Sequence, residues 1–172
     1  MIFGLAIITA IFLTIYTVGQ QVLRQSAYDP QIQMVEDATV SLASGSAVPA
    51  DFMPVSRQLF DMSQSLAPFT MIFDGSGVPL ESSATLAGEA AVPPAGTFDY
   101  AKLHGENRFT WQPAVGARFA VVLKYYAAGS KSGFVLVGRS LREVEIRNEK
   151  ILEIVALAWL GCVFVFAVKI FA

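Results

Sequence analysis

The sequence predicts an α+β domain, built on a five-stranded antiparallel sheet with flanking helices, that lies between two membrane-spanning helices. Two observations predict the membrane helices. Only 15% of the 172 residues are charged, against about 25% in ordinary soluble domains, and the apolar residues gather at the two ends. A third observation predicts the domain: the middle of the chain carries interspersed charges, glycines and prolines between short apolar runs.

The first apolar segment, residues 2–19, contains no charged residue. As a helix it would extend about 27 Å, close to the roughly 30 Å of a hydrocarbon core. A cleaved signal peptide is the alternative, but no Lys or Arg precedes the apolar run and no small-residue cleavage motif follows it. We therefore expect an uncleaved membrane helix over residues 1–20.

The second apolar segment runs from residue 151 to residue 172, with Glu153 near its start and Lys169 near its end. The uncharged stretch between them is short for a full crossing, so a crossing requires the Lys169 ammonium to reach the far headgroups. A buried helix of a soluble domain is the alternative. We expect a second membrane helix here.

Three helices are predicted within the middle domain, residues 21–140. Asp29 and Pro30 form a helix start, an N-cap acceptor followed by proline at the first helical position. Apolar residues then recur at helical spacing as far as about Ser44. Shorter helices are predicted over residues 55–66 and 97–104.

The strands follow from apolar runs that turn residues separate. Residues 69–73 and 78–83 flank the Asp74-Gly75-Ser76-Gly77 turn and predict a hairpin. Three further strands are predicted over residues 108–112, 117–126 and 133–138. Strands with helices on one face form an α+β layer.

The junction after the last strand matches a capping box, Ser140-Leu141-Arg142-Glu143, and predicts a juxtamembrane helix over residues 141–150 that continues into the second apolar segment. A 3-4-3-4 repeat follows, and it predicts helix pairing, with the polar Asn148 in a position that fixes register. The alternative is a helix that packs on its own domain. The predicted pairing residues are Leu141, Val144, Asn148, Ile151 and Val155.

Phe109-Thr110-Trp111-Gln112-Pro113 and Gly138-Arg139-Ser140-Leu141 carry a family resemblance. The chain resembles the N-terminal extracytoplasmic sensor regions of bacterial membrane histidine kinases, and small two-span membrane proteins of the same build. The resemblance implies a PAS- or Cache-like fold and a multi-pass protein of the bacterial inner (cell) membrane. It also places the middle domain outside the cytoplasm, whereas a simple count of Lys and Arg favours the cytoplasm.

The sequence departs from those kinases because it lacks the HAMP linker, the phospho-accepting helix and the ATP-binding domain. The resemblance therefore implies signal sensing without kinase activity, with the signal passed to a second copy or to a membrane signalling protein. The alternative is a structural or scaffold subunit of a membrane complex that binds a protein and no small ligand.

The residues give little support for catalysis, metal binding or nucleic-acid binding. His104 is the only histidine and no nucleophile or carboxylate stands with it at motif spacing, so we expect no enzyme and no catalytic residue. No cluster of metal-ligating side chains predicts a metal or a cofactor. We expect Cys162 to be a packing residue. The net charge of −2 offers no basic surface for nucleic acid.

A small-ligand pocket is the one site that the residues suggest. Aromatic walls and one guanidinium on adjacent strands would hold a small anionic or amphipathic ligand. The alternative places Trp111 in the core and Arg118 on a solvated face. The predicted ligand-binding residues are Trp111, Arg118, Tyr125 and Tyr126.

Overall fold

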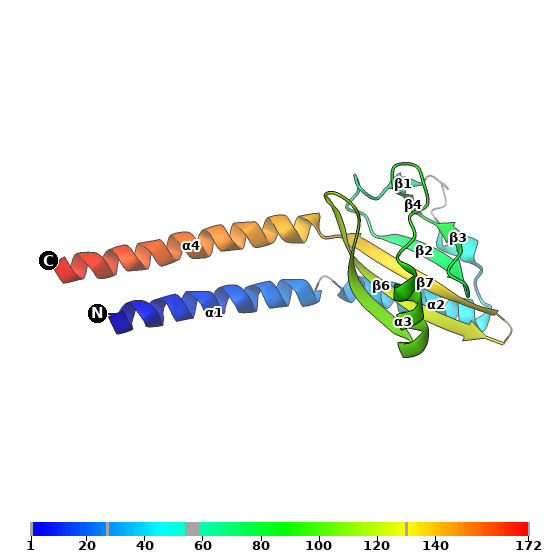
Figure 1. Cartoon of the computed structure of the whole chain (residues 1–172), viewed down its shortest axis with the longest axis horizontal. Coiled ribbons are helices and arrows are strands. Elements are labelled where there is room, and N and C mark those ends of the chain that lie inside the picture. The colour runs from blue at the N-terminus through cyan, green and yellow to red at the C-terminus, as the bar shows by residue number, and fades with distance from the viewer. Residues whose placement is uncertain (1, 27, 54–58, 130, 172) are drawn as a thin grey trace. The chain divides into compact units, whose positions relative to one another are not determined.

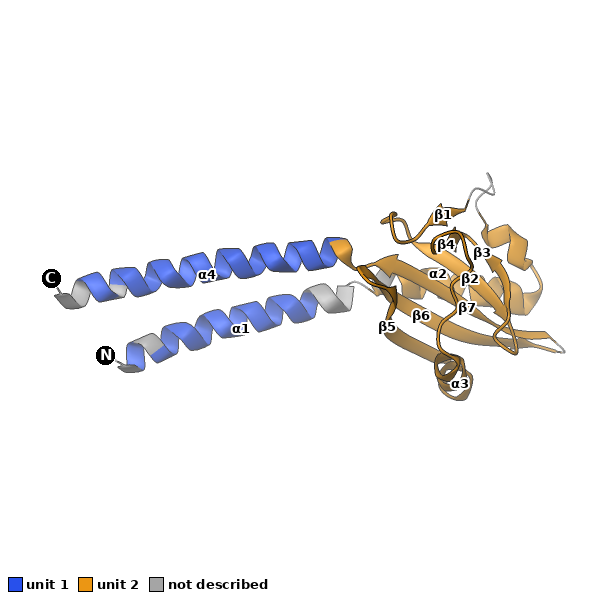
Figure 2. Cartoon of the chain, turned by 45° about the horizontal axis from the view of Figure 1, so that its top comes forward, with its two compact units in different colours: residues 1–26, 143–172 blue, residues 27–142 orange. Residues whose placement is uncertain are grey.

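The computed structural model describes residues 2–26, 28–53, 59–129 and 131–171, and the chain divides into two compact units (Figure 2). Unit 1 comprises Met1–Ser26 and Glu143–Ala172, and unit 2 comprises Ala27–Arg142. Unit 1 consists of helix α1 (Ile2–Ser26) and all but the first residue of helix α4 (Arg142–Phe171).

Unit 2 is built on a five-stranded antiparallel sheet with the strand order β3-β2-β7-β6-β5 (Figure 1). The central strand β7 therefore pairs with β2, which lies far from it in the sequence, and with β6, to which a short turn joins it. The five strands are β2 (Phe69–Asp74), β3 (Pro79–Ser82), β5 (Glu106–Ala114), β6 (Ala117–Ala128) and β7 (Lys131–Ser140). The predicted α+β architecture with flanking helices is confirmed.

Helix α2 (Asp29–Ser44) covers one face of this sheet. It has proline in its first turn, as predicted, but its N-cap is Tyr28, without a side-chain capping bond, so the predicted N-cap role of Asp29 is wrong. It ends at Gly45, whose φ of 73° lies in the left-handed region and whose N–H bonds the Leu42 carbonyl. Its inward side chains Val35, Ala38 and Leu42 pack on aliphatic side chains of β2, β6 and β7. Because a branched aliphatic side chain suits a pleated strand, this face forms a largely aliphatic layer.

Helix α3 (Ala95–His104) covers the opposite face. Its buried residues Phe98 and Ala101 pack into a second cluster that is rich in aromatic side chains. The outer strand β5 is not reached by α2, and on that side it carries polar side chains such as Glu106 and Arg108. The sheet thus has an aromatic core on one face and an aliphatic core on the other.

The predicted helix over residues 55–66 is wrong for the part that the structure describes, while residues 54–58 lie outside the described residues. Phe60–Asp61 forms β1, which pairs in parallel with β4 (Ala84–Thr85). The Asp61 carboxylate then accepts the Ser63 N–H at 2.8 Å and forms a turn, so side-chain bonding to the backbone competes with the helix. A short 3₁₀ helix, Pro49–Phe52, precedes this region.

The sequence predicts two membrane-spanning helices, but none of the helices described in the structure is both long and apolar enough to cross a membrane. That part of the predicted architecture is unsupported.

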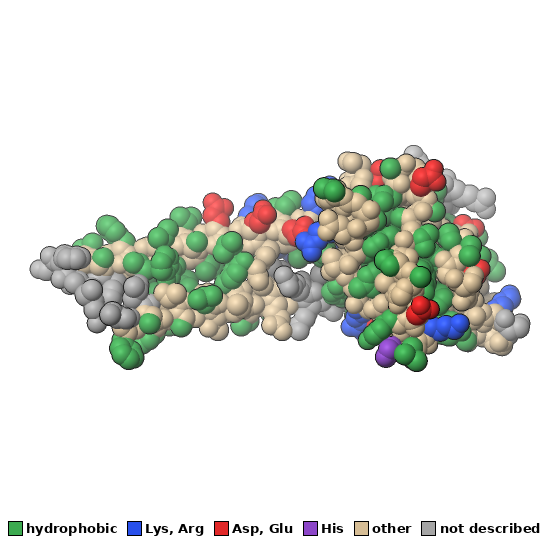
Figure 3. All heavy atoms as spheres, in the orientation of Figure 1, with side chains coloured by type: hydrophobic (Ala, Val, Ile, Leu, Met, Phe, Trp, Pro, Cys, Tyr) green, Lys and Arg blue, Asp and Glu red, His purple; other side chains and the backbone are tan. Residues whose placement is uncertain are grey.

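Within unit 1, α1 and α4 run side by side in opposite directions (Figures 1 and 2). The Trp159 indole N–H donates to the Thr9 hydroxyl at 3.1 Å and links the two helices. Large apolar side chains remain exposed along both helices, among them Phe3, Ile11 and Leu13 of α1 and Leu157, Leu160 and Phe164 of α4 (Figure 3). Among the described residues, the buried apolar clusters therefore belong to unit 2 and not to unit 1.

Candidate functional site

The four predicted ligand-binding residues do not line one pocket, because they divide between the two faces of the sheet. Side chains alternate along a strand, so Tyr125 and Tyr126 point to opposite faces. Trp111 and Tyr125 belong to the aromatic core beneath α3. Arg118 and Tyr126 lie on the α2 face, with Arg118 exposed at the start of β6 and Tyr126 half-buried near its end.

The α3 face is filled by aromatic rings in edge contact. Phe98 packs against Phe73 and Phe134 with centroid separations of 5.0 and 5.1 Å. Tyr125 packs against Phe134 at 5.2 Å, and the Lys102 ammonium lies 5.9 Å from the Tyr125 ring centre. Interiors packed in this way leave few voids larger than a water molecule. Trp111 and Tyr125, two of the aromatic residues that suggested a ligand, thus belong to the core, whereas Tyr126 lies on the other face.

The α2 face is open at one end, where the helix stops short of the strands. Sixteen helical residues extend about 24 Å, whereas the twelve residues of β6 extend about 40 Å. A cavity of about 650 Å³ lies beyond the end of α2, and we call it the tip cavity. Its lining comes from the end of α2, the loop after it, β3 and the β6–β7 turn, and includes Leu42, Val48, Leu80, Tyr126, Lys131 and Ser132.

The polar groups of the tip cavity are few. Among its lining residues only Lys131 carries a charge, and the hydroxyls of Tyr126, Ser44 and Ser132 accompany it. Burial raises the pKa of the Tyr126 phenol, so the group stays a neutral hydrogen-bonding hydroxyl at ordinary pH. Gly133 makes room for this ring, because a Cβ there would lie 2.8 Å from the Tyr126 hydroxyl oxygen. The cavity can thus hold a small amphipathic molecule with an anionic end.

A second cavity, of about 540 Å³, lies on the other side of Leu80 and is lined by β3, β4 and the loops around them. Its lining elements join neither α1 nor α4 directly. The tip cavity differs in this respect. Its walls include the last residues of α2 and the first residues of β7, and the other ends of these two elements continue into α1 and α4. We therefore take the tip cavity as the candidate functional site.

Sequence reasoning found one residue of this site, Tyr126, and missed the rest. Leu42, Val48 and Leu80 belong to no chemical motif, and they meet only because α2 ends where β3 and the β6–β7 turn begin. One signal was present: Gly45 and Gly129, both with positive φ, mark the ends of α2 and β6. That these two ends lie together at one cavity depends on the tertiary structure.

The predicted helix-pairing residues lie mostly in unit 1. Val144, Asn148, Ile151 and Val155 are half-buried positions of α4, whereas Leu141 precedes the helix and donates its N–H to the Arg118 carbonyl at 2.9 Å. Ser140, the predicted capping residue, is the last residue of β7, and its hydroxyl accepts the Arg142 N–H at 3.3 Å. Helix α4 begins at Arg142 and not at the predicted Leu141. The predicted repeat therefore coincides with one side of α4.

Other chemically interesting residues are scattered. His104, exposed at the end of α3, stacks on Tyr100 and has its Nδ1 3.0 Å from the Tyr100 carbonyl. Cys162 is exposed on α4. Across the described part of the chain, no three His, Cys, Asp or Glu side chains come together to hold a metal ion.

Comparison with known proteins gives no family assignment, because the chain matches no family model and no curated protein.

Proposed function

We propose that this protein is a membrane-anchored sensor whose sheet domain, PAS- or Cache-like in build, lies outside the cytoplasm of a bacterial cell and binds a small ligand in the tip cavity. Signal then passes to another copy or to a membrane signalling protein. The observation that carries the proposal is the layout of α2 and β7, which pack against each other and share the cavity at one end. At the other end, α2 follows α1 and β7 leads into α4.

This layout suits signal transfer for a physical reason. A ligand changes a conformational equilibrium only if it contacts the two states differently. A molecule held between the end of α2 and the start of β7 favours one placement of these elements over another. Each element is the sequence neighbour of one helix of unit 1, and this order is what would let a shift between them act on both helices.

Lipid anchoring is supported by composition and by exposure. Residues 2–19 contain no charge, and large apolar side chains remain exposed along both helices. Side chains such as Phe3 and Phe164, which are 85% and 70% exposed, are stabilised by burial against lipid. Because the described helices do not meet the requirement for a full crossing, the first experiment must test lipid insertion directly.

That experiment is extraction of membranes that contain the full chain, first with alkaline carbonate and then with detergent. We expect the protein to resist carbonate and to dissolve in detergent. A Lys131→Cys variant in a Cys162→Ala background then reports the side of the membrane, because Lys131 is exposed in the β6–β7 turn. Labelling of intact cells by a membrane-impermeant maleimide supports the extracytoplasmic placement. Release by carbonate, or labelling only after permeabilisation, overturns the corresponding part of the proposal.

Ligand binding is tested separately, with the full chain in lipid nanodiscs and 4-phenylbutyrate as the probe. We expect a saturable rise in the melting temperature, because a ligand at ten times its Kd stabilises the folded state by about 1.4 kcal/mol. Val48→Trp, at a residue that lines the tip cavity but not the second cavity, should abolish the rise. Val115→Trp is the matched control, since Val115 is fully exposed in the β5–β6 turn. Equal responses of the two variants would exclude the tip cavity.

A second candidate function is a scaffold subunit that binds a protein partner. It is favoured by the division of the four predicted ligand residues between two faces and by the filled aromatic face. Co-purification of a stoichiometric membrane partner, without any ligand-induced change in melting temperature, would support this function over sensing.

A further inference from the structure

The two helices of unit 1 face each other along matching half-buried positions. On α1 these positions recur about every four residues, and on α4 they recur at a similar spacing. The other side chains of α1 and α4 whose burial the structure describes are mostly exposed, so the half-buried positions mark the line along which the helices meet. On α1 they include Gly4, Ile8, Phe12, Tyr16, Gly19 and Gln20, and on α4 they include Asn148, Ile151, Val155, Trp159 and Val163.

The Trp159–Thr9 hydrogen bond sets the register of these two lines. In antiparallel helices with equal rise, each step forward along one helix matches one step backward along the other. Gln20 lies eleven residues after Thr9, and Asn148 lies eleven residues before Trp159. Gln20 and Asn148 therefore lie at the same level of the pair, as do Phe12 and Val155 within one residue.

Asn148 needs a hydrogen-bond donor at this level. Its Oδ1 is buried and is the one side-chain nitrogen or oxygen, among the described residues, that is both inaccessible and without a partner. An unpaired buried acceptor costs roughly 1–3 kcal/mol. The Gln20 Nε2 carries two hydrogens, of which one donates to the Tyr16 hydroxyl. The second hydrogen is available to an acceptor on the facing helix.

We propose that Gln20 donates a hydrogen bond to Asn148 Oδ1, and that this bond together with Trp159–Thr9 fixes the register of α1 against α4. If α4 slides along α1 by one helical turn, about four residues, Asn148 leaves the level of Gln20. It moves to the level of Tyr16 in one direction and to the level four residues after Gln20 in the other. In either case Trp159 loses Thr9 and comes to the level of Leu5 or Leu13. Of the three registers, the observed one alone places both Asn148 and Trp159 at the level of a polar residue of α1.

This proposal goes beyond the proposed function, because it concerns how unit 1 holds itself together and does not depend on a ligand. In a sensor, the same two bonds would define the resting register, and displacement by one turn is a known type of switching motion. The test must therefore measure register and not signalling.

Disulfide cross-linking of the full chain in lipid nanodiscs measures register directly, in a Cys162→Ala background. The pair Phe12→Cys with Val155→Cys reports the observed register. The pair Ile8→Cys with Val155→Cys reports a slide of one turn. We expect the first pair to cross-link about tenfold faster than the second. Equal rates for the two pairs would overturn the register itself.

The polar contact is tested by Asn148→Leu and Gln20→Leu in both cysteine backgrounds. Each should reduce the tenfold preference to about twofold, a loss of the size expected for an interhelical hydrogen bond. The double variant should be no worse than either single one, because both remove the same bond. Thr17→Leu is the control, since the Thr17 hydroxyl is exposed and bonds Leu13 of its own helix. Effects no larger than that of the control, or additive effects of the two variants, would overturn the contact.

Discussion

The two faces of the sheet in unit 2 are covered by one helix each, yet they differ in how completely they are filled. Beneath α3, aromatic rings meet edge to face and close the core. Beneath α2, aliphatic side chains form the core, and the strands continue beyond the helix to leave the tip cavity. Residue type alone therefore does not mark a binding site. The aromatic face, whose residue types suggested a ligand, is the one whose rings pack against each other.

The two faces also differ in how their covering helices connect to unit 1. The α3 face is formed by α3 and by strands of the same sheet, β7 included. The α2 face includes the two elements that continue into α1 and α4. The two covering helices differ in sequence order, because α2 directly follows α1 whereas α3 neighbours neither helix of unit 1. Substitutions on the two faces should therefore differ in size and in kind.

The largest effect should follow from Phe98→Ala on the closed face. Phe98 is buried and contacts both Phe73 and Phe134, so its removal leaves a cavity that neighbouring rings fill poorly. We expect a loss of about 3–5 kcal/mol in the free energy of unfolding, measured by urea titration. Leu42→Ala on the open face is the comparison. Because Leu42 already lines the tip cavity, its loss should cost only about 2 kcal/mol. Equal losses would show that the open face is closed in solution.

A somewhat smaller effect is expected from Gly138→Ala. A Cβ at this position would overlap the ring of Phe69, which is buried on the α3 face. Overpacking of this kind costs about 1–3 kcal/mol, and thermal unfolding measures it. Gly96→Ala is the matched control, because nothing lies within 4 Å of the added Cβ. The control should be neutral or slightly stabilising, and a similar loss in both variants would argue against close packing around Phe69.

Some features of the fold could be predicted from the sequence because they depend on neighbours in the chain. Asp29-Pro30 starts α2, and the Asp74–Gly77 turn joins β2 to β3. The pairing of β2 with β7 could not be predicted in this way, because it joins segments about 60 residues apart through contacts that only the folded sheet provides. For the same reason the sequence assigned Tyr126 to a pocket but could not place Leu42 and Leu80 beside it.

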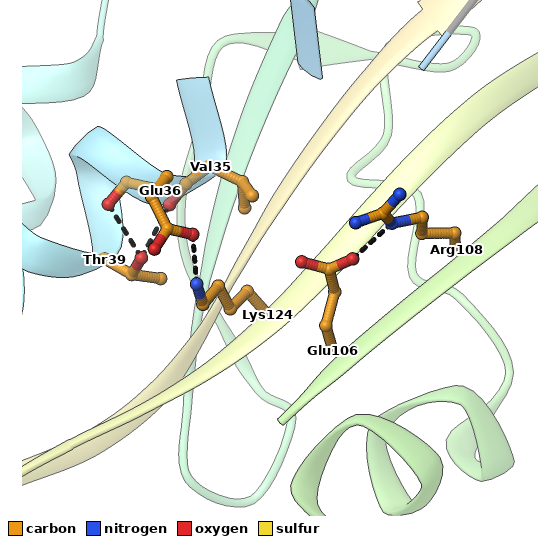
Figure 4. A network of polar contacts seen from close by, with 6 residues as sticks. All are labelled: Val35, Glu36, Thr39, Glu106, Arg108 and Lys124. Carbon is orange, nitrogen blue, oxygen red and sulfur yellow. Dashed lines mark hydrogen bonds and ion pairs between the residues drawn. The ribbon is translucent and has the colours of Figure 1, made fainter. Parts of the chain in front are cut away.

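A smaller effect is expected from the ion pair that ties α2 to the outer half of the sheet. The Lys124 ammonium on β6 contacts the Glu36 carboxylate, while Glu106 and Arg108 pair on β5 (Figure 4). The Glu36 side chain is 52% exposed, so water screens the attraction. A double-mutant cycle of Glu36→Gln and Lys124→Met should give about 0.5 kcal/mol, falling with added salt. A coupling above about 2 kcal/mol would mean that this edge of α2 is far more closely packed than the open face implies.

The smallest effect concerns the Asp74 turn, which lies at the same end of the sheet as the tip cavity because Asp74 pairs with Gly133. The Ser76 hydroxyl, followed by the Val78 and Ser76 N–H groups, donates to Asp74 and holds the pKa of its carboxyl below its usual value. A lowered pKa favours the charged form in the folded state. Its contribution to stability is therefore complete above the usual Asp value, about 4, and is lost as the pH falls through the lowered pKa.

Ser76→Ala removes the largest of these contributions, so it should move the titration midpoint of Asp74 upward, which carboxyl ¹³C NMR measures. In Asp74→Asn the side chain does not titrate, and the difference in melting temperature from the unsubstituted chain should shrink as the pH falls below about 4. An unchanged midpoint in Ser76→Ala would mean that the turn opens in solution. The end of the sheet that forms the tip cavity would then be flexible on both faces, and the contrast between the two faces would apply only to the middle of the sheet.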